Sequence, residues 1–232
     1  MLPLTDTIRS RSFPAVNWLI IAANVAAFIL LEVPLGEREL NAFVLTWGLV
    51  PSELFGGNPL AVAAMFTSMF LHGGWLHLLS NMWALYIFGD NVEDRLGSGR
   101  YLAFYLICGV AAGLAQSFIN PASDIPQVGA SGAIAGVLAG YLLLYPAARV
   151  VTLIPIFLFP WFVEIPAVIY LLIWFGSQLL NGVAALGSMA QGGGVAFWAH
   201  IGGFVAGLLL VRLFARRPRA QHRWYADERL PW

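Results

Sequence analysis

A serine and a histidine in two separate apolar segments are the residues best suited to chemistry. Ser131 lies in the stretch "GASGAIAG" at 129–136, and His200 lies in "FWAHIGGFVAG" at 197–207. A serine hydroxyl is activated when an imidazole lies within hydrogen-bonding reach and can take up its proton. An activated serine is therefore the first chemical hypothesis for this chain.

A second pair of polar residues, His77 and Asn81, lies in the apolar segment "LHGGWLHLLSNMWALYIFGD". Because they are four residues apart, both project from one face of a helix. Both can donate an N–H to a developing negative charge, and the first turn of a helix at Ser131 offers an unpaired backbone N–H. Together they predict an oxyanion hole, although His77 and Asn81 can also serve only to cross-link helices. We expect a structural role for His72, which lies nearer the surface.

The elements that carry these residues are predicted to cross a membrane. The 232-residue chain is 59% hydrophobic and 10% charged, whereas soluble domains have about 25% charged residues. A span needs about 20 mostly apolar residues. The sequence predicts an all-α membrane protein with six spans and a long first outer loop over 34–71; the spans are 14–33, 72–89, 101–120, 130–146, 162–183 and 197–215. The expected regions are an N-terminal segment 1–13, a six-span domain 14–215 and a tail 216–232.

The distribution of arginine predicts the orientation, since the chain contains no lysine. Six spans place both termini on one side, and all arginines except Arg38 then share that side. Positive charge gathers on the cytoplasmic face of membrane proteins, so both termini are expected in the cytoplasm. The early sequence shows no cleavable signal peptide, and a bacterial plasma membrane is the simplest expected location. The formal net charge of zero argues against a nucleic-acid partner, and the single cysteine, Cys108, excludes an intramolecular disulfide.

The polar residues are predicted to lie at one depth. With a rise of about 1.5 Å per residue, Ser131 lies roughly 22 Å above the inner end of its span, His200 roughly 24 Å and His77 roughly 20 Å. The hydrocarbon core is about 30 Å thick. The three side chains are therefore expected to form one site below the outer surface.

Glycines explain how the helices can meet at that site. Gly132, Gly136 and Gly140 recur every four residues after Ser131, and Gly203 and Gly207 follow His200. Small residues at this spacing let two membrane helices approach backbone to backbone. Such faces also occur in helices that only pack, but here each one begins beside a residue capable of chemistry.

These motifs resemble those of the rhomboid intramembrane serine proteases. The resemblance covers nearly the whole chain: "H-x4-H-x3-N" in the second span, "GASG" in the fourth and "AHIGGFVAG" in the sixth. It implies Ser131 as nucleophile and His200 as general base and then general acid. It also implies an oxyanion hole from His77, Asn81 and the Ser131 backbone, with supporting roles for His72, Gly129, Gly132, Gly203 and Gly207.

The same resemblance implies partners and a substrate route. The family cleaves transmembrane protein substrates near the outer face of the lipid bilayer, usually after a small residue in an easily unwound helix. Substrates enter near the second and fifth spans. No cofactor and no metal are expected, and the sequence predicts neither a particular substrate nor an oligomeric state.

Two departures from the family pattern matter. Many members carry a Trp-Arg pair in the first outer loop, where this chain has Ala63 and Ala64; the expected effect is on loop anchoring or stability. Some members place an aromatic residue four positions after the serine, packed on the catalytic histidine, where this chain has Ala135. Another side chain is expected to fill that gap.

Other functions fit the sequence less well. A Ser-His-Asp hydrolase lacks an aspartate within any span, and Ala133 breaks the G-x-S-x-G pattern. A metalloprotease lacks H-E-x-x-H, and a metal held by His72, His77 and His200 lacks a nearby carboxylate or cysteine. A channel or transporter lacks paired broken helices. The main alternative is a non-catalytic protein that uses the same fold to bind or escort client helices.

Overall fold

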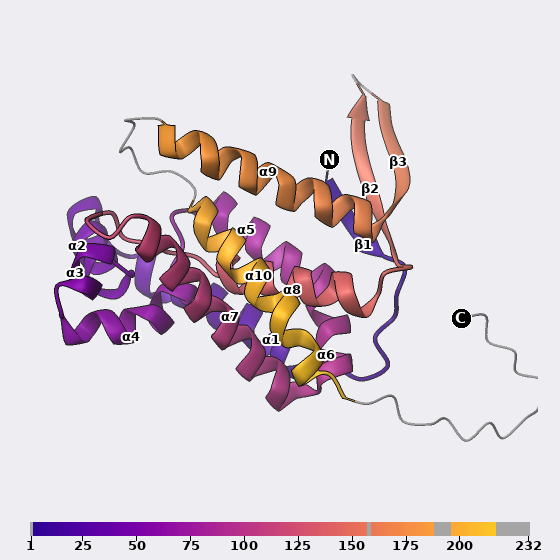
Figure 1. Cartoon of the computed structure of the whole chain (residues 1–232), viewed down its shortest axis with the longest axis horizontal. Helices are drawn as coiled ribbons and strands as arrows, with labels where there is room; N and C mark the ends of the chain where they lie inside the picture. Colours follow the sequence, from indigo (N-terminus) through magenta and orange to yellow (C-terminus); the bar gives the residue numbers. More distant parts are fainter. Residues whose placement is uncertain (1, 157–158, 188–195, 217–232) are drawn as a thin grey trace, which may run out of the picture.

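Three helices form the centre of the molecule in the computed structural model, which describes residues 2–156, 159–187 and 196–216. They are α7 (Ser98–Ile119), α8 (Ser131–Leu144) and α10 (Phe197–Phe214), and each packs against the other two. Every residue of α8 from Gly132 to Tyr141 is buried. Helix α8 is therefore the core element, and α7 and α10 cover it (Figure 1).

A group of helices and one separate helix flank this centre. The group contains α1 (Ala15–Ala27) with its π-helical end η1 (Phe28–Glu32), and α5 (Trp75–Ala84) continued by η3 (Leu85–Gly89) and α6 (Asp90–Leu96). The separate helix is α9 (Ala167–Gly187), which packs chiefly against α10. In Figure 1 α9 lies along the margin of the bundle.

The predicted long loop 34–71 contains short helices at one end of the bundle (Figure 1). They are α2 (Glu37–Trp47), α3 (Pro51–Phe55), α4 (Pro59–Thr67) and the 3-10 turn η2 (Ser68–Phe70). Leu49 and Gln127 exchange backbone hydrogen bonds of 2.8 and 3.0 Å. This bridge ties the loop to the segment that leads into α8.

The opposite end carries a small sheet that the sequence analysis did not predict (Figure 1). Its antiparallel strands are β1 (Leu2–Asp6), β2 (Arg149–Ile156) and β3 (Phe159–Pro166), in the order β1-β2-β3. The predicted start of the fifth span at 162 is therefore wrong, because the helix begins at Ala167. A short run of aromatic and β-branched residues suits a strand as well as a helix, and its hydropathy does not separate them.

Most predicted spans have a counterpart, and the prediction of a predominantly helical membrane protein is confirmed. Among the described residues, four helices are long and apolar enough to cross a bilayer: Ala15–Glu32, Ser98–Ile119, Ala167–Leu186 and Phe197–Phe214. A fifth candidate is the pair Pro59–Phe70 and Trp75–Leu96, bent by 78°. The predicted second span therefore becomes helical at Trp75 rather than at 72. Helix α8 is apolar but shorter, so the count of six stays a prediction, as do the domain limits.

The buried carboxylate of Glu93 holds the first turn of α1 in place. Glu93 accepts hydrogen bonds from the backbone amides of Val16 at 3.1 Å and Asn17 at 2.7 Å. It also accepts one from the Ser98 hydroxyl at 2.6 Å. First-turn amides have no partner within their own helix, and a negative charge there is favourable. Glu93 therefore joins the starts of α1 and α7.

Candidate active site

Ser131 and His200 lie within hydrogen-bonding distance. Ser131 is the first residue of α8 and His200 lies in the first turn of α10. The Ser131 Oγ and His200 Nε2 atoms are 2.8 Å apart, and His200 is 9% exposed. Two helices that start at the same end of the bundle therefore bring together residues 69 positions apart in the chain.

Glycines at the α8–α10 contact set this distance. A Cβ atom added to Gly203 would overlap the carbonyl oxygen of Gly132, and one added to Gly207 would overlap that of Gly136. The backbones thus touch without intervening side chains, as the glycine spacing predicts. The catalytic roles of Ser131 and His200 and the supporting roles of the glycines are proposals.

The start of α10 is held by a residue that the sequence analysis did not identify. The Gln116 Oε1 atom on α7 accepts hydrogen bonds from the backbone amides of Trp198 at 3.1 Å and Ala199 at 3.3 Å. Both amides belong to the first turn; the Trp198 amide has no acceptor within its own helix, whereas the Ala199 amide also donates to the Ala196 carbonyl at 3.0 Å. Gln116 therefore caps the turn that carries His200.

Residue 129 must be a glycine because of its backbone conformation and its close contact with His77. Its φ angle is +123°, a region that other residues rarely adopt. An added Cβ would lie 2.7 Å from the Cε1 and Nε2 atoms of His77. The imidazole of His77 therefore lies against the backbone two residues before Ser131.

The predicted oxyanion donors are oriented as donors. The Gly73 amide donates to His77 Nδ1 at 3.3 Å, which places the proton of the neutral ring on Nε2, the atom beside Gly129. Asn81 is 5% exposed, and its Nδ2 atom has no partner among the described residues. The Ser131 amide likewise has no backbone acceptor in this part of the chain. The amide of Asn81 and the backbone amide of Ser131 thus have no such acceptor among the described residues, and the oxyanion hole stays a prediction.

His72 lies outside this set of donors. It is buried, and its ring meets that of His77 edge-on with centroids 5.1 Å apart. Its backbone amide donates to both carboxylate oxygens of Glu32 at 3.1 Å. Both ring nitrogens of His72 are buried without a partner among the described residues, so the structural role expected for His72 stays a prediction. Glu32 was not identified from the sequence, although an acidic residue at the end of an apolar segment was visible there.

Helix α9 contributes two contacts to His200 that sequence reasoning did not assign. The Trp174 ring lies against the imidazole with centroids 5.9 Å apart, and supplies the aromatic neighbour that Ala135 does not. The Gln178 Oε1 atom lies 2.8 Å from His200 Nδ1. Their spacing of four residues on one apolar helix was the available sign.

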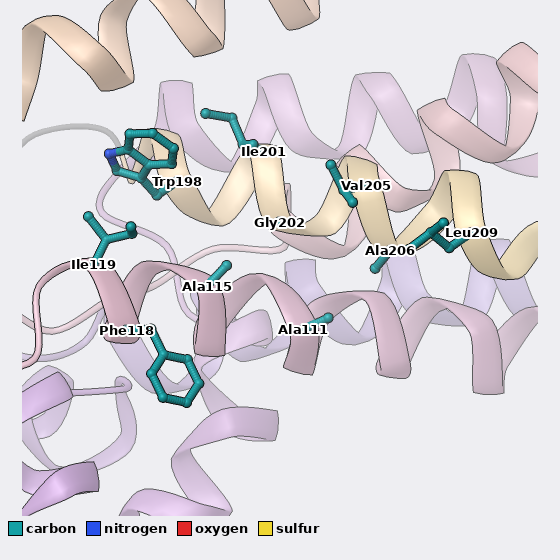
Figure 2. A pocket seen from close by; sticks show the side chains of 10 residues that line it. All are labelled: Ala111, Ala115, Phe118, Ile119, Trp198, Ile201, Gly202, Val205, Ala206 and Leu209. Carbon is teal, nitrogen blue, oxygen red and sulfur yellow. The ribbon is translucent and has the colours of Figure 1, made fainter.

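An apolar groove elsewhere on the bundle holds none of the predicted site residues. It is an open groove between α7 and α10 with a volume of about 480 Å³ (Figure 2). Its lining consists of small and apolar side chains such as Ala111, Ala115 and Leu209. The candidate site therefore rests on the geometry around Ser131 and not on this groove.

Comparison with known proteins places the chain in a family. The Rhomboid domain matches residues 59–217. The chain is 33% identical over 135 residues to the Rhomboid protease GluP of Bacillus subtilis, covering 56% of this chain and 24% of that protein. It is 31% identical over 150 residues to the human Presenilin-associated rhomboid-like protein, mitochondrial, covering 60% and 36%. It is 27% identical over 223 residues to Rhomboid protein 1, mitochondrial, of Saccharomyces cerevisiae, covering 90% and 58%.

The matches thus span between about a quarter and three fifths of the length of these relatives. The family match includes Ser131, His200 and both predicted oxyanion residues, His77 and Asn81. With the motifs, the membrane-spanning helices and the family match in agreement, the chain belongs to the rhomboid family.

Proposed function

We propose that this protein is an intramembrane serine endopeptidase that cleaves transmembrane helices of other membrane proteins near the outer face of the bilayer. The observation that carries the proposal is the 2.8 Å hydrogen bond between Ser131 and His200 at the heads of two tightly packed helices. A relative named as a rhomboid protease supports the same reaction class.

The proposed reaction begins when Ser131 Oγ attacks the carbonyl carbon of the scissile peptide bond. Its proton passes to His200 Nε2, and the carbonyl oxygen becomes an oxyanion. When the C–N bond breaks, His200 returns the proton to the leaving amine, and Ser131 holds the acyl group as an ester. Water then attacks that ester with His200 again as base, which releases the new carboxylate and regenerates the hydroxyl.

The oxyanion is proposed to accept hydrogen bonds from His77 Nε2, Asn81 Nδ2 and the Ser131 amide. Neither Asn81 Nδ2 nor the backbone amide of Ser131 has such an acceptor among the described residues, which supports this role. Donors fixed in advance need no reorganisation when charge develops, and each such donor contributes about 10²–10³-fold to the rate in serine proteases. Substrate binding would therefore pair groups that folding leaves unpaired.

The proposed orientation places both termini in the cytoplasm and the site toward the outer side, in a bacterial plasma membrane. Eleven of the twelve basic residues then lie on the cytoplasmic side: Arg9, Arg11, Arg95, Arg100, Arg149, Arg212, Arg216, Arg217, Arg219, Arg223 and Arg229. Relatives come from both a bacterium and mitochondria. Alkylation of single cysteines added at 38 and 149, from either side of the membrane, tests the orientation.

The test of the function is cleavage in proteoliposomes. Purified protein is reconstituted with a pool of single-span helices that carry small residues and a glycine or proline near one end, in water enriched in ¹⁸O. We expect products with one ¹⁸O atom in each new carboxylate and no products from Ser131→Ala or His200→Ala. Helices that bind equally to the wild type and Ser131→Ala without cleavage in either would contradict the proposal and favour the non-catalytic binder.

A further inference from the structure

A chain of hydrogen bonds reaches from α9 to the proposed nucleophile. The Ser177 hydroxyl donates to the carbonyl oxygen of Trp174 at 2.6 Å. Gln178 Nε2 lies 3.1 Å from Ser177 Oγ, and Gln178 Oε1 lies 2.8 Å from His200 Nδ1. The last link is the 2.8 Å contact of His200 Nε2 with Ser131 Oγ.

The direction of this chain is fixed at its α9 end. Ser177 has one hydroxyl proton, which it donates to Trp174, so its oxygen can only accept from Gln178. The amide nitrogen of Gln178 must therefore face Ser177, and its oxygen must face His200. An amide oxygen only accepts, so His200 Nδ1 carries the ring proton and Nε2 keeps its lone pair toward Ser131.

We propose that Gln178 is a positioning residue that holds His200 in the tautomer and orientation required of a base, so that the dyad is ready only while α9 is docked. The inference rests on the proposed function and deepens it. In serine proteases a residue at the second imidazole nitrogen fixes the tautomer, and the wrong tautomer costs about 10⁴-fold in rate. Gln178 does this with a neutral amide in place of a carboxylate.

The packing of α9 couples the position of this helix to the orientation of His200. Only 17% of its membrane-spanning window is buried, against 33% for α7, and its main neighbour is α10. Both side chains that it places on His200, Trp174 and Gln178, lie one helical turn apart on one face. A displacement of α9 therefore removes the hydrogen-bond acceptor and the aromatic contact together, while the α8–α10 contact stays in place.

The test compares three variants. Gln178→Leu removes the acceptor at similar size, Gln178→Glu retains an acceptor, and Asn181→Leu is the matched control. Asn181 is an exposed amide one turn along α9, and within the described residues its side chain bonds only to the Ser177 carbonyl. Each protein is purified in mild detergent, and only the folded, monodisperse fraction is compared. The readouts are the rate of labelling by a fluorophosphonate across pH, and ¹⁵N spectra of histidine-labelled protein, with the His200 signals assigned by their loss in His200→Ala.

We expect Gln178→Leu to label about 10–100-fold more slowly, as for a lost hydrogen bond to a group that becomes charged. We also expect its His200 spectrum to lose the pure Nδ1–H tautomer. Gln178→Glu should label readily with the acidic limb of its pH profile at higher pH, because a carboxylate stabilises the imidazolium. Asn181→Leu should match the wild type.

Wild-type labelling and tautomer in Gln178→Leu would overturn the inference, while the proposed function would stand. A tautomer change in Gln178→Leu in a protein that never labels would support the positioning role and contradict the proposed function. Because the spectra need no activity, the two failures are distinguishable.

Discussion

The two faces of His200 are held in contrasting ways. On the Nε2 side, Ser131 is fixed by backbone contact between α8 and α10, where glycines leave no room for a methyl group. On the Nδ1 side, Trp174 and Gln178 reach the imidazole from α9, a helix with few buried residues. The distance between the proposed nucleophile and the proposed base is therefore set in the core, whereas the orientation of the proposed base depends on a helix at the margin of the bundle.

The largest expected effect comes from disrupting the backbone contact between α8 and α10. Gly203→Ala places a methyl group onto the Gly132 carbonyl oxygen, and backbone cannot yield as a flexible side chain does. We expect fluorophosphonate labelling to fall to background and the melting temperature to drop. Gly176→Ala is the matched control, because an added Cβ there meets nothing within 4 Å. Equal labelling of both variants would contradict the assignment of the dyad distance to this contact.

A smaller loss is expected when an oxyanion donor is removed from the same rigid region. Asn81→Ala should lower the labelling rate by about 10²–10³-fold. Its melting temperature should not fall, because Asn81 Nδ2 has no partner among the described residues. A destabilised variant with normal labelling would instead show that Asn81 cross-links helices. Thermal unfolding and labelling of the same preparation separate these outcomes.

The contact of α9 with His200 can be tested by cross-linking α9 to α10 with a disulfide. A Cβ added to Gly182 would lie 3.4 Å from the Cβ of Phe197, close to the separation in a disulfide. In the oxidised Gly182→Cys/Phe197→Cys protein we expect normal labelling by the small probe but several-fold slower cleavage of a membrane substrate. Reduction of the bond is the internal control. Unchanged substrate cleavage after oxidation would argue against movement of α9 during entry.

The smallest expected effect lies at the far end of the bundle. Burial raises the pKa of Asp6 to about 6, although its carboxylate accepts from Tyr141 and Asn91. Because the folded protein binds this proton more tightly than the unfolded chain does, the stability that the proton contributes is fully present below pH 3.8 and is lost as the pH rises through about 6. Asp6→Asn should remove this dependence and protect the β1 amides from hydrogen exchange at pH 7. Parallel pH dependences in both proteins would contradict this account.

The sequence predicts the main parts of the candidate site because they follow helical spacing. The separation of four residues predicts that His77 and Asn81 share one helix face, and the glycine repeats indicate which helices touch. The sheet was missed because pairing of β1 with β2 joins residues about 150 positions apart, and a short apolar run does not reveal its partner. Trp174 and Gln178 were visible but unassigned, since their role depends on how α9 rotates against α10.

The most direct measurement of the central claim is mass-spectrometric mapping of a fluorophosphonate adduct on the purified protein. The proposed dyad predicts a single adduct on Ser131 that is absent from His200→Ala and from Ser131→Ala. An adduct on another serine, or one on Ser131 that forms equally fast without His200, would contradict it.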